Sequence, residues 1–237
     1  MNETIVLLHW VYAAVMFSGA GYFIWLSRRP TGIPSYEFLI ASIIPIWSGL
    51  AYFSIAIGQG LFETSDKTVY FARYIDWVVT TPLLLVALAL TAMFYSPRKN
   101  KVLIWSLVSA DVLMILTGLI GDFSPPALTY VWYFIGVGAL VFILYLIWGP
   151  LLKIAREGGL ALEKHFKRTA AYLTILWVCY PSAWIIGPSG LGLTQELTDV
   201  AIFIFLPILS KVGFSLLDLH GLKALHAPAA ASKKTVS

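Results

Sequence analysis

Seven apolar segments, each about as long as a membrane-spanning helix, take up almost the whole chain of 237 residues. A helix needs about 20 apolar residues to cross a hydrocarbon core of roughly 30 Å. The segments are continuous and aliphatic rather than alternating, so they favour helices over the strands of a membrane barrel. We therefore predict an all-α bundle of seven transmembrane helices, at about 4–26, 36–58, 70–94, 102–121, 128–150, 167–187 and 196–219.

The composition agrees with a membrane protein, since 59% of residues are hydrophobic and only 12% are charged. We predict one seven-helix domain at 1–226 and a disordered cytoplasmic tail at 227–237, which is small and polar. The first segment is too long for a signal-peptide core and is expected to be retained. The sequence contains no metal-ligand cluster, phosphate loop or nucleophile elbow. We therefore expect neither a metal site nor an enzyme.

Lysine and arginine collect in alternate connections between the segments. They follow the first, third and fifth segments and recur after the seventh, whereas the opposite connections carry only Lys67. The positive-inside rule then predicts an extracellular N-terminus and a cytoplasmic C-terminus for a multi-pass protein of the cell membrane. The net charge of +4 is accounted for by these topology signals, so no nucleic-acid partner is expected.

A few ionisable residues remain inside the segments, and Lys211, about 15 residues into the seventh, is the most informative of them. A charge at mid-bilayer costs about 2.5 to 3.5 kcal/mol on insertion scales, so such a residue is paired or functional. Two interpretations of Lys211 are open. It pairs with Asp76 to hold two helices together, or its desolvated amine forms a Schiff base with a carbonyl compound, with Asp76 as counterion.

The third segment carries an unusual run of polarity, 73-RYIDWVVTTPLLL-85. Arg73 and Asp76 are three residues apart, which puts them on one helix face, and Trp77 continues that surface. The hydroxyl of Thr81 is expected to bond a carbonyl of the preceding turn. Thr81 and Pro82 are also what a simple packing kink contains, so this pair does not by itself indicate a ligand site.

The sixth segment carries aromatic residues on one side. Trp177, Tyr180 and Trp184 are spaced by three and four residues, and Trp132 and Tyr133 of the fifth segment add to them. Such a stripe is either ordinary core or the wall of a slot for a flat, elongated apolar ligand.

Taken together, the run in the third segment, 111-DVLMILTGLIG-121, 176-LWVCYPSAWIIGPSG-190 and 206-LPILSKVGFSLLDLHG-221 resemble the microbial (type 1) rhodopsins along essentially the whole chain. The resemblance implies all-trans retinal bound covalently to Lys211 as a Schiff base, with Asp76 as primary counterion and Arg73 linking it to the extracellular side. It also implies a buried protonated Asp111 near one end of retinal. The implied retinal pocket contains Trp77, Thr81, Met114, Gly118, Trp132, Tyr133, Trp177, Tyr180, Pro181, Trp184 and Pro207.

Two departures define a subgroup. Outward proton pumps of the family carry a carboxylic acid eleven residues after the counterion, where this chain has Ala87, and a second aspartate where it has Pro207. With the segment 47-WSGLAY-52, these features resemble the xenorhodopsins and the Anabaena sensory rhodopsin group. That resemblance implies either a light-driven inward proton pump or a photosensor with a separate soluble cytoplasmic transducer, and a homotrimer in the membrane. A seven-helix receptor or transporter without chromophore is the third alternative.

Proton acceptors and donors are expected toward the ends of the seventh segment. Asp218 lies seven residues after Lys211, roughly 10 Å along the helix and near the same face, and is the candidate cytoplasmic acceptor. His220 is close enough in sequence to assist it. Asp199 is a candidate on the outer side. Asp218 is alternatively a solvated helix end, and Asp199 with Glu196 a solvated helix start. We favour the inward pump.

Overall fold

The computed structural model describes residues 2–29, 32–64 and 67–234, with side chains described as far as 226. In this part of the chain, seven helical stretches have the length and apolar composition to cross a membrane. They confirm the predicted all-α bundle. Their helices are α1 (Glu3–Ser27), α2 (Ser35–Ala56), α3 (Phe71–Ala92), α4 (Lys101–Asp122), α5 (Pro126–Leu146), α6 (Leu152–Glu157), α7 (Leu160–Ile186), α8 (Glu196–Pro207) and α9 (Phe214–Lys234).

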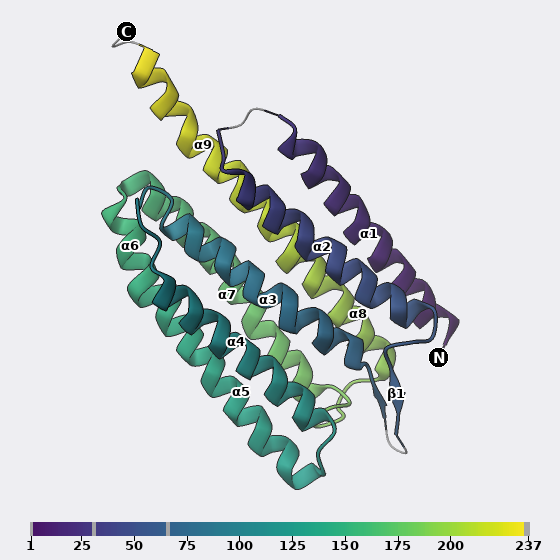
Figure 1. The fold of residues 1–237 in the computed structure, drawn as a ribbon. Helices are drawn as coiled ribbons and strands as arrows, with labels where there is room; N and C mark the ends of the chain where they lie inside the picture. The colour runs from purple at the N-terminus through teal and green to yellow at the C-terminus, as the bar shows by residue number, and fades with distance from the viewer. Residues whose placement is uncertain (1, 30–31, 65–66, 235–237) are drawn as a thin grey trace.

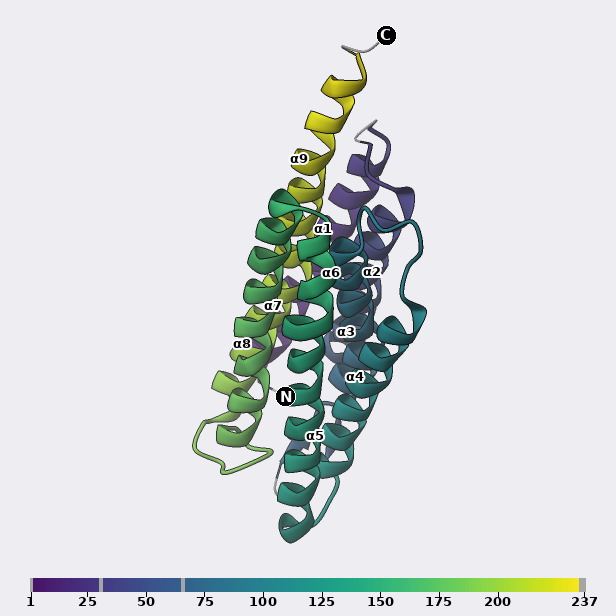
Figure 2. The ribbon, with the colours of Figure 1, turned by 90° about the vertical axis from the view of Figure 1, so that its left-hand side faces the viewer.

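Helices α1 to α5 pack side by side in chain order, and α7, α8 and α9 close the bundle against α1 and α3 (Figures 1 and 2). Helix α3 lies at the centre of the bundle. Of the residues in its most apolar 18-residue stretch 67% are buried, against 28% to 56% in the other six spans. Its leucines Leu84, Leu85 and Leu88 are fully enclosed in the largest apolar cluster. Groups on α3 are therefore shielded from lipid on most sides.

Two π-helical segments interrupt the spans. The first, Ile147–Leu151, joins α5 to α6, and the second, Ile208–Gly213, joins α8 to α9 and contains Lys211. Each contains or follows a proline, Pro150 and Pro207 respectively. A proline supplies no backbone donor, so the regular ladder of the helix cannot continue through it unchanged.

A short antiparallel hairpin between α2 and α3 was not predicted. Strands β1 (Phe62–Glu63) and β2 (Thr68–Val69) pair Phe62 with Val69 and Glu63 with Thr68. The hairpin and the N-terminus lie at one end of the bundle, and the C-terminus at the opposite end (Figure 1). We call these the hairpin end and the C-terminal end.

The sequence-based boundaries differ from the structure at the C-terminal end. The stretch 151–166, which lies between the fifth and sixth predicted segments and was expected to be a connection, is helical except at Gly158 and Gly159. Gly159 has a φ of 102°, a conformation that residues other than glycine rarely adopt. Helix α9 runs on to Lys234, so 227–234 is helix where a disordered tail was predicted, and 235–237 lie outside the described residues. The domain boundary at 226 stays a prediction.

Candidate functional site

The buried amine of Lys211 meets a carboxylate and a hydroxyl at the centre of the bundle. Lys211 is 1% exposed, and its Nζ donates hydrogen bonds to Asp76 Oδ2 and to Ser48 Oγ, the latter at 2.8 Å. Ser48 in turn donates to Asp76 Oδ2 at 3.0 Å and lies 2.6 Å from the Tyr12 hydroxyl. Thr80 Oγ1 contacts the other oxygen, Oδ1, at 3.2 Å. The predicted pairing of Lys211 with Asp76 is therefore present in the structure.

Pro207 lies at the end of α8, four residues before Lys211. Its missing N–H frees the carbonyl of Phe203 four residues earlier. That carbonyl accepts a hydrogen bond of 2.8 Å from the Tyr52 hydroxyl, which ties α8 to α2 just before the π-helical turn. Pro207 is not among the residues that line the aromatic cavity, and its place in the retinal pocket stays a prediction. It lies instead where the helix changes to the segment that holds Lys211.

An apolar cavity, which we call the aromatic slot, runs between α3, α4, α5 and α7. The rings of Tyr133 and Trp184 stack in its wall, with centroids 5.4 Å apart and an interplanar angle of 15°. Apart from Lys211 and Pro207, all predicted pocket residues line it: Trp77, Thr81, Met114, Gly118, Trp132, Tyr133, Trp177, Tyr180, Pro181 and Trp184. Residues not predicted for it are Tyr74, Ile115, Gly136, Val137, Leu140 and Phe203.

One residue that lines the slot contacts the segment that holds Lys211, and another is bonded to a buried carboxyl of α4. The hydroxyl of Tyr180 lies 2.9 Å from Ser210 Oγ, the residue before Lys211. Thr81 Oγ1 lies 2.7 Å from the Trp77 carbonyl, as expected from the sequence, and 2.6 Å from Asp111 Oδ2. Thr81 is therefore held by a carboxyl of α4 as well as by its own helix, which a simple packing kink does not require.

A second charged group lies toward the hairpin end. Arg73 NH1 donates to Asp199 Oδ2 at 2.9 Å, and the guanidinium stacks 4.2 Å above the ring of Tyr70. Tyr70 donates to Glu196 Oε1 at 2.6 Å, and burial together with this bond raises the pKa of the Tyr70 phenol. The side chain of Asp199 is only 12% exposed, so it is not a solvated helix start. Asp199 and Arg73 form a largely buried pair.

A third group lies near the C-terminal end around Asp218, which is 3% exposed. Thr91 Oγ1 lies 2.9 and 3.0 Å from its two carboxylate oxygens, and His165 Nε2 lies 3.1 Å from Oδ1. Asp218 is thus enclosed by α3 and α7 rather than solvated. His220 does not join it: that ring is exposed and bonds the Leu216 carbonyl of its own helix at 2.8 Å.

The residues that sequence reasoning missed are single polar side chains within apolar runs or predicted loops. Ser48 and Thr91 are polar residues within the apolar runs of α2 and α3, and that polarity was the available signal. His165 lay in a region predicted as loop, so its contact with Asp218 had no sequence signal. In the described part of the chain, no three His, Cys, Asp or Glu side chains are grouped as metal ligands would be.

Comparisons with known proteins agree with this architecture. A family model described as bacteriorhodopsin-like protein matches residues 3–225. Archaerhodopsin-1 of Halorubrum ezzemoulense is 34% identical over 212 residues, which cover 87% of this chain and 80% of that protein. Sensory rhodopsin-2 of Natronomonas pharaonis is 30% identical over 221 residues, which cover 93% of this chain and 90% of that protein.

A similar solved structure is the thermophilic rhodopsin from Rubrobacter xylanophilus, with a TM-score of 0.87 and 37% identity, covering 93% of this chain and 97% of that one. The chain belongs to the bacteriorhodopsin-like family of microbial rhodopsins. It is a retinal-binding, light-driven membrane protein of seven helices and not an enzyme, as the sequence predicted.

Proposed function

We propose that this protein is a light-driven inward proton pump of the xenorhodopsin group, with all-trans retinal linked covalently to Lys211. The residues fit that chromophore: a buried amine is held by a carboxylate, and an apolar slot walled by flat rings adjoins it. Retinal supplies light absorption and a change of shape that redirects the proton on the linked nitrogen. Asp76, with Ser48 and Thr80 bonded to it, would balance the positive charge of the protonated Schiff base in the dark.

The distribution of basic residues supports an outside N-terminus. Connections at the C-terminal end hold Arg98, Lys99 and Arg156, whereas the hairpin end has Lys67 in its connections. In this orientation the Arg73–Asp199 pair lies on the outer side of Lys211, and Asp218 on the cytoplasmic side.

The observation that carries the inward direction is the buried Asp218 group. An outward pump needs a carboxylic acid that returns a proton from the cytoplasm, and the position that serves this in relatives is Ala87, buried at 6% exposure in the leucine cluster. Asp218 is a buried carboxylate on the cytoplasmic side, and Thr91 and His165 hold it where it can accept a proton. Uptake from outside is then assigned to the Asp199 side.

The direction is tested in vesicles or cells with retinal and a pH electrode in the medium. Light should raise the pH outside cells, and an uncoupler should abolish the change; acidification or no change would refute the proposal. Asp218→Asn, which keeps shape but loses the charge, should slow or abolish transport. His220→Gln, on the exposed face of the same helix, is the matched control and should transport normally.

The chromophore link has a separate test. Lys211→Ala should abolish the visible absorption band on adding retinal, whereas the unchanged chain should form one. A visible band of normal intensity in the variant would exclude Lys211 as the attachment site. No band in either protein would instead favour a receptor or transporter without chromophore.

A photosensor is the second candidate, favoured by the 30% identity to a sensory rhodopsin. Its transducer would be a separate soluble protein bound at the C-terminal end. Light-dependent capture of such a partner, together with no pH change in illuminated vesicles, would replace the pump proposal. We further propose a homotrimer, which chemical crosslinking in membranes tests.

A further inference from the structure

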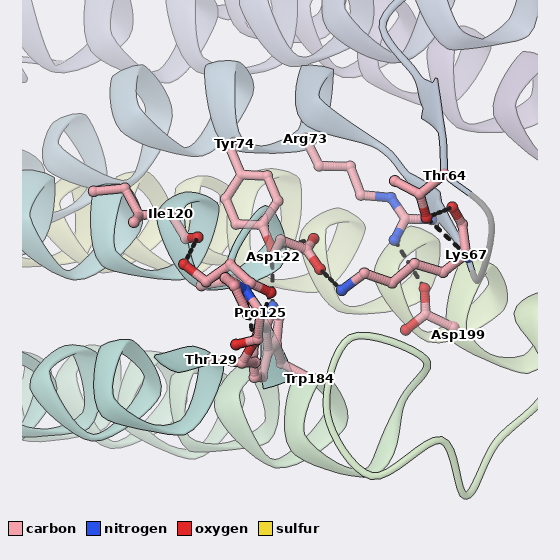
Figure 3. Close-up of polar contacts among 12 residues, drawn as sticks. Thr64, Lys67, Arg73, Tyr74, Ile120, Asp122, Pro125, Thr129, Trp184 and Asp199 are labelled. Carbon is pink, nitrogen blue, oxygen red and sulfur yellow. Dashed lines mark hydrogen bonds and ion pairs between the residues drawn. The ribbon is translucent and has the colours of Figure 1, made fainter. Parts of the chain in front are cut away.

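Lys67, at the turn of the hairpin, reaches the end of α4. Its Nζ lies 2.6 Å from Asp122 Oδ1, and the side chains are 18% and 5% exposed. Figure 3 shows this pair beside the Arg73–Asp199 pair, at the hairpin end of the bundle. An ion pair this enclosed is screened by solvent much less than a surface pair.

Asp122 is also the end of a hydrogen-bonded chain that leads inward (Figure 3). Its second oxygen, Oδ2, accepts a bond of 2.9 Å from the Tyr74 hydroxyl. The same hydroxyl accepts a bond of 2.8 Å from Trp184 Nε1. Tyr74 and Trp184 are only 6% and 8% exposed, and these hydrogen bonds give the Tyr74 hydroxyl and the Trp184 indole N–H the partners that buried polar groups need.

The two inner members of the chain form a partition between two cavities. Tyr74 and Trp184 line the aromatic slot and also a polar cavity at the hairpin end, which Lys67 and Asp122 line from the other side. Within the slot, Trp184 stacks on Tyr133 and Tyr74 meets the ring of Trp77 edge to face at 5.2 Å. The orientation of both rings therefore affects the shape of the slot.

The backbone beneath Asp122 is fixed as well. Thr129, in the first turn of α5, bonds the carbonyl of Gly121 at 3.1 Å. A Cβ at Gly121 would stand 3.3 Å from Trp132 Cβ, so α4 and α5 approach closely here. Asp122 is consequently presented from a rigid position, while Lys67 comes from a hairpin anchored at both ends.

We propose that Asp122 is a positioning residue for the aromatic slot: held by Lys67, it fixes Tyr74 and through it Trp184, and so sets the shape and electrostatic potential of that wall. The proposal rests on the proposed function in that retinal occupies the slot. Neither Lys67 nor Asp122 lines the slot, and the Asp122 carboxylate is bonded to one lining residue, Tyr74. Its influence is thus on the wall and not on the linked nitrogen directly.

Asp122 and Lys67 carry opposite charges at nearly the same place. In the low effective dielectric of a buried site, removing one of them leaves the charge of the other uncompensated. Removing Asp122 and removing Lys67 should therefore change the electrostatic potential at the wall in opposite directions. Asp122→Asn keeps an oxygen that accepts from Tyr74 and loses only the charge. Asp122→Ala loses both. The first variant isolates the electrostatic effect and the second adds the loss of ring position.

The spectral experiment uses the full chain with retinal. Asp122→Asn and Lys67→Gln should move the visible absorption maximum in opposite directions, and the double variant should return toward the unaltered protein because the two opposite shifts offset each other. Glu3→Gln, which removes an exposed carboxylate from the start of α1 at the same end of the bundle, is the control and should shift it least. Equal maxima in all variants, or shifts of the same sign, would overturn the proposal.

A second readout needs no chromophore. The protein has nine tryptophans, so the effect on Trp184 is measured as the difference between proteins with and without Trp184. In apoprotein, Asp122→Ala should change tryptophan emission, and the change should vanish in a Trp184→Phe background. A change that persists in that background would refute the coupling. If unaltered protein forms no visible band, the retinal assignment fails while this measurement still tests Asp122.

Discussion

Removing one hydroxyl next to Lys211 should weaken the site measurably. Ser48 Oγ donates to Asp76, accepts from Lys211 and contacts Tyr12, and it is fully buried. Ser48→Ala removes these bonds without changing the backbone. A hydrogen bond to a charged group contributes about 1.5 to 3 kcal/mol. For a chain of this size, 1 kcal/mol corresponds to roughly 2 to 4 °C in the unfolding midpoint, so a decrease of about 3 to 12 °C is expected.

The assay is thermal unfolding in detergent, followed by loss of the visible band in the pigment and by near-ultraviolet circular dichroism in apoprotein. Ser42→Ala is the matched control: it is a buried serine of the same helix whose hydroxyl bonds only the Phe38 carbonyl, at 2.7 Å. That neutral bond contributes about 0.5 to 1.5 kcal/mol. If Ser48→Ala lowers the midpoint no more than Ser42→Ala, the hydroxyl does not stabilise the charged pair.

Two other substitutions test the slot and the Arg73–Asp199 pair. Gly136→Val should reduce the pigment regenerated per mole of protein, since its Cβ would stand 2.9 Å from Thr117 Oγ1, whereas Gly138→Val, with nothing within 4 Å, should regenerate normally. Absorbance after adding retinal measures this, and equal yields would contradict the slot wall. Asp199→Asn should lower the unfolding midpoint and slow pumping, because the buried guanidinium of Arg73 loses its charged partner; an unchanged midpoint would argue against a stabilising pair.

The fold was predictable because desolvated backbone leaves few choices. An apolar run of membrane length must bond its own carbonyls, so counting such runs indicated the number of spanning helices. The hairpin at 62–69 and the helical connection through 152–157 were not predictable in this way. Both lie beyond the apolar segments counted in the sequence, where tertiary contacts such as that of Lys67 with Asp122 decide the local structure.

The site was predictable where a single helix carries it. Arg73, Asp76 and Thr81 follow from helical spacing on α3, and the aromatic spacing on α7 predicted one wall of the slot. Most contacts between helices far apart in sequence were not predicted, and the pairing of Lys211 with Asp76 was an exception. His165 rather than His220 meets Asp218 because α7 packs against α9, and spacing along one helix contains no information on that packing.

The distance that a proton crosses inside the protein is longer than the seven residues between Lys211 and Asp218 suggest. The amine of Lys211 touches Asp76, and the carboxylate of Asp218 touches Thr91, both on α3. Fifteen residues separate those two positions, or about 22 Å along the helix, against roughly 10 Å between the backbones of Lys211 and Asp218.

Between Asp76 and Thr91, α3 has no ionisable side chain, and Ala87 lies in the buried leucine cluster. Direct transfer between the two groups is thus excluded in this conformation. If the protein pumps inward as proposed, the apolar stretch is the barrier against proton leakage in the dark, and the light-driven step has to open it toward Asp218.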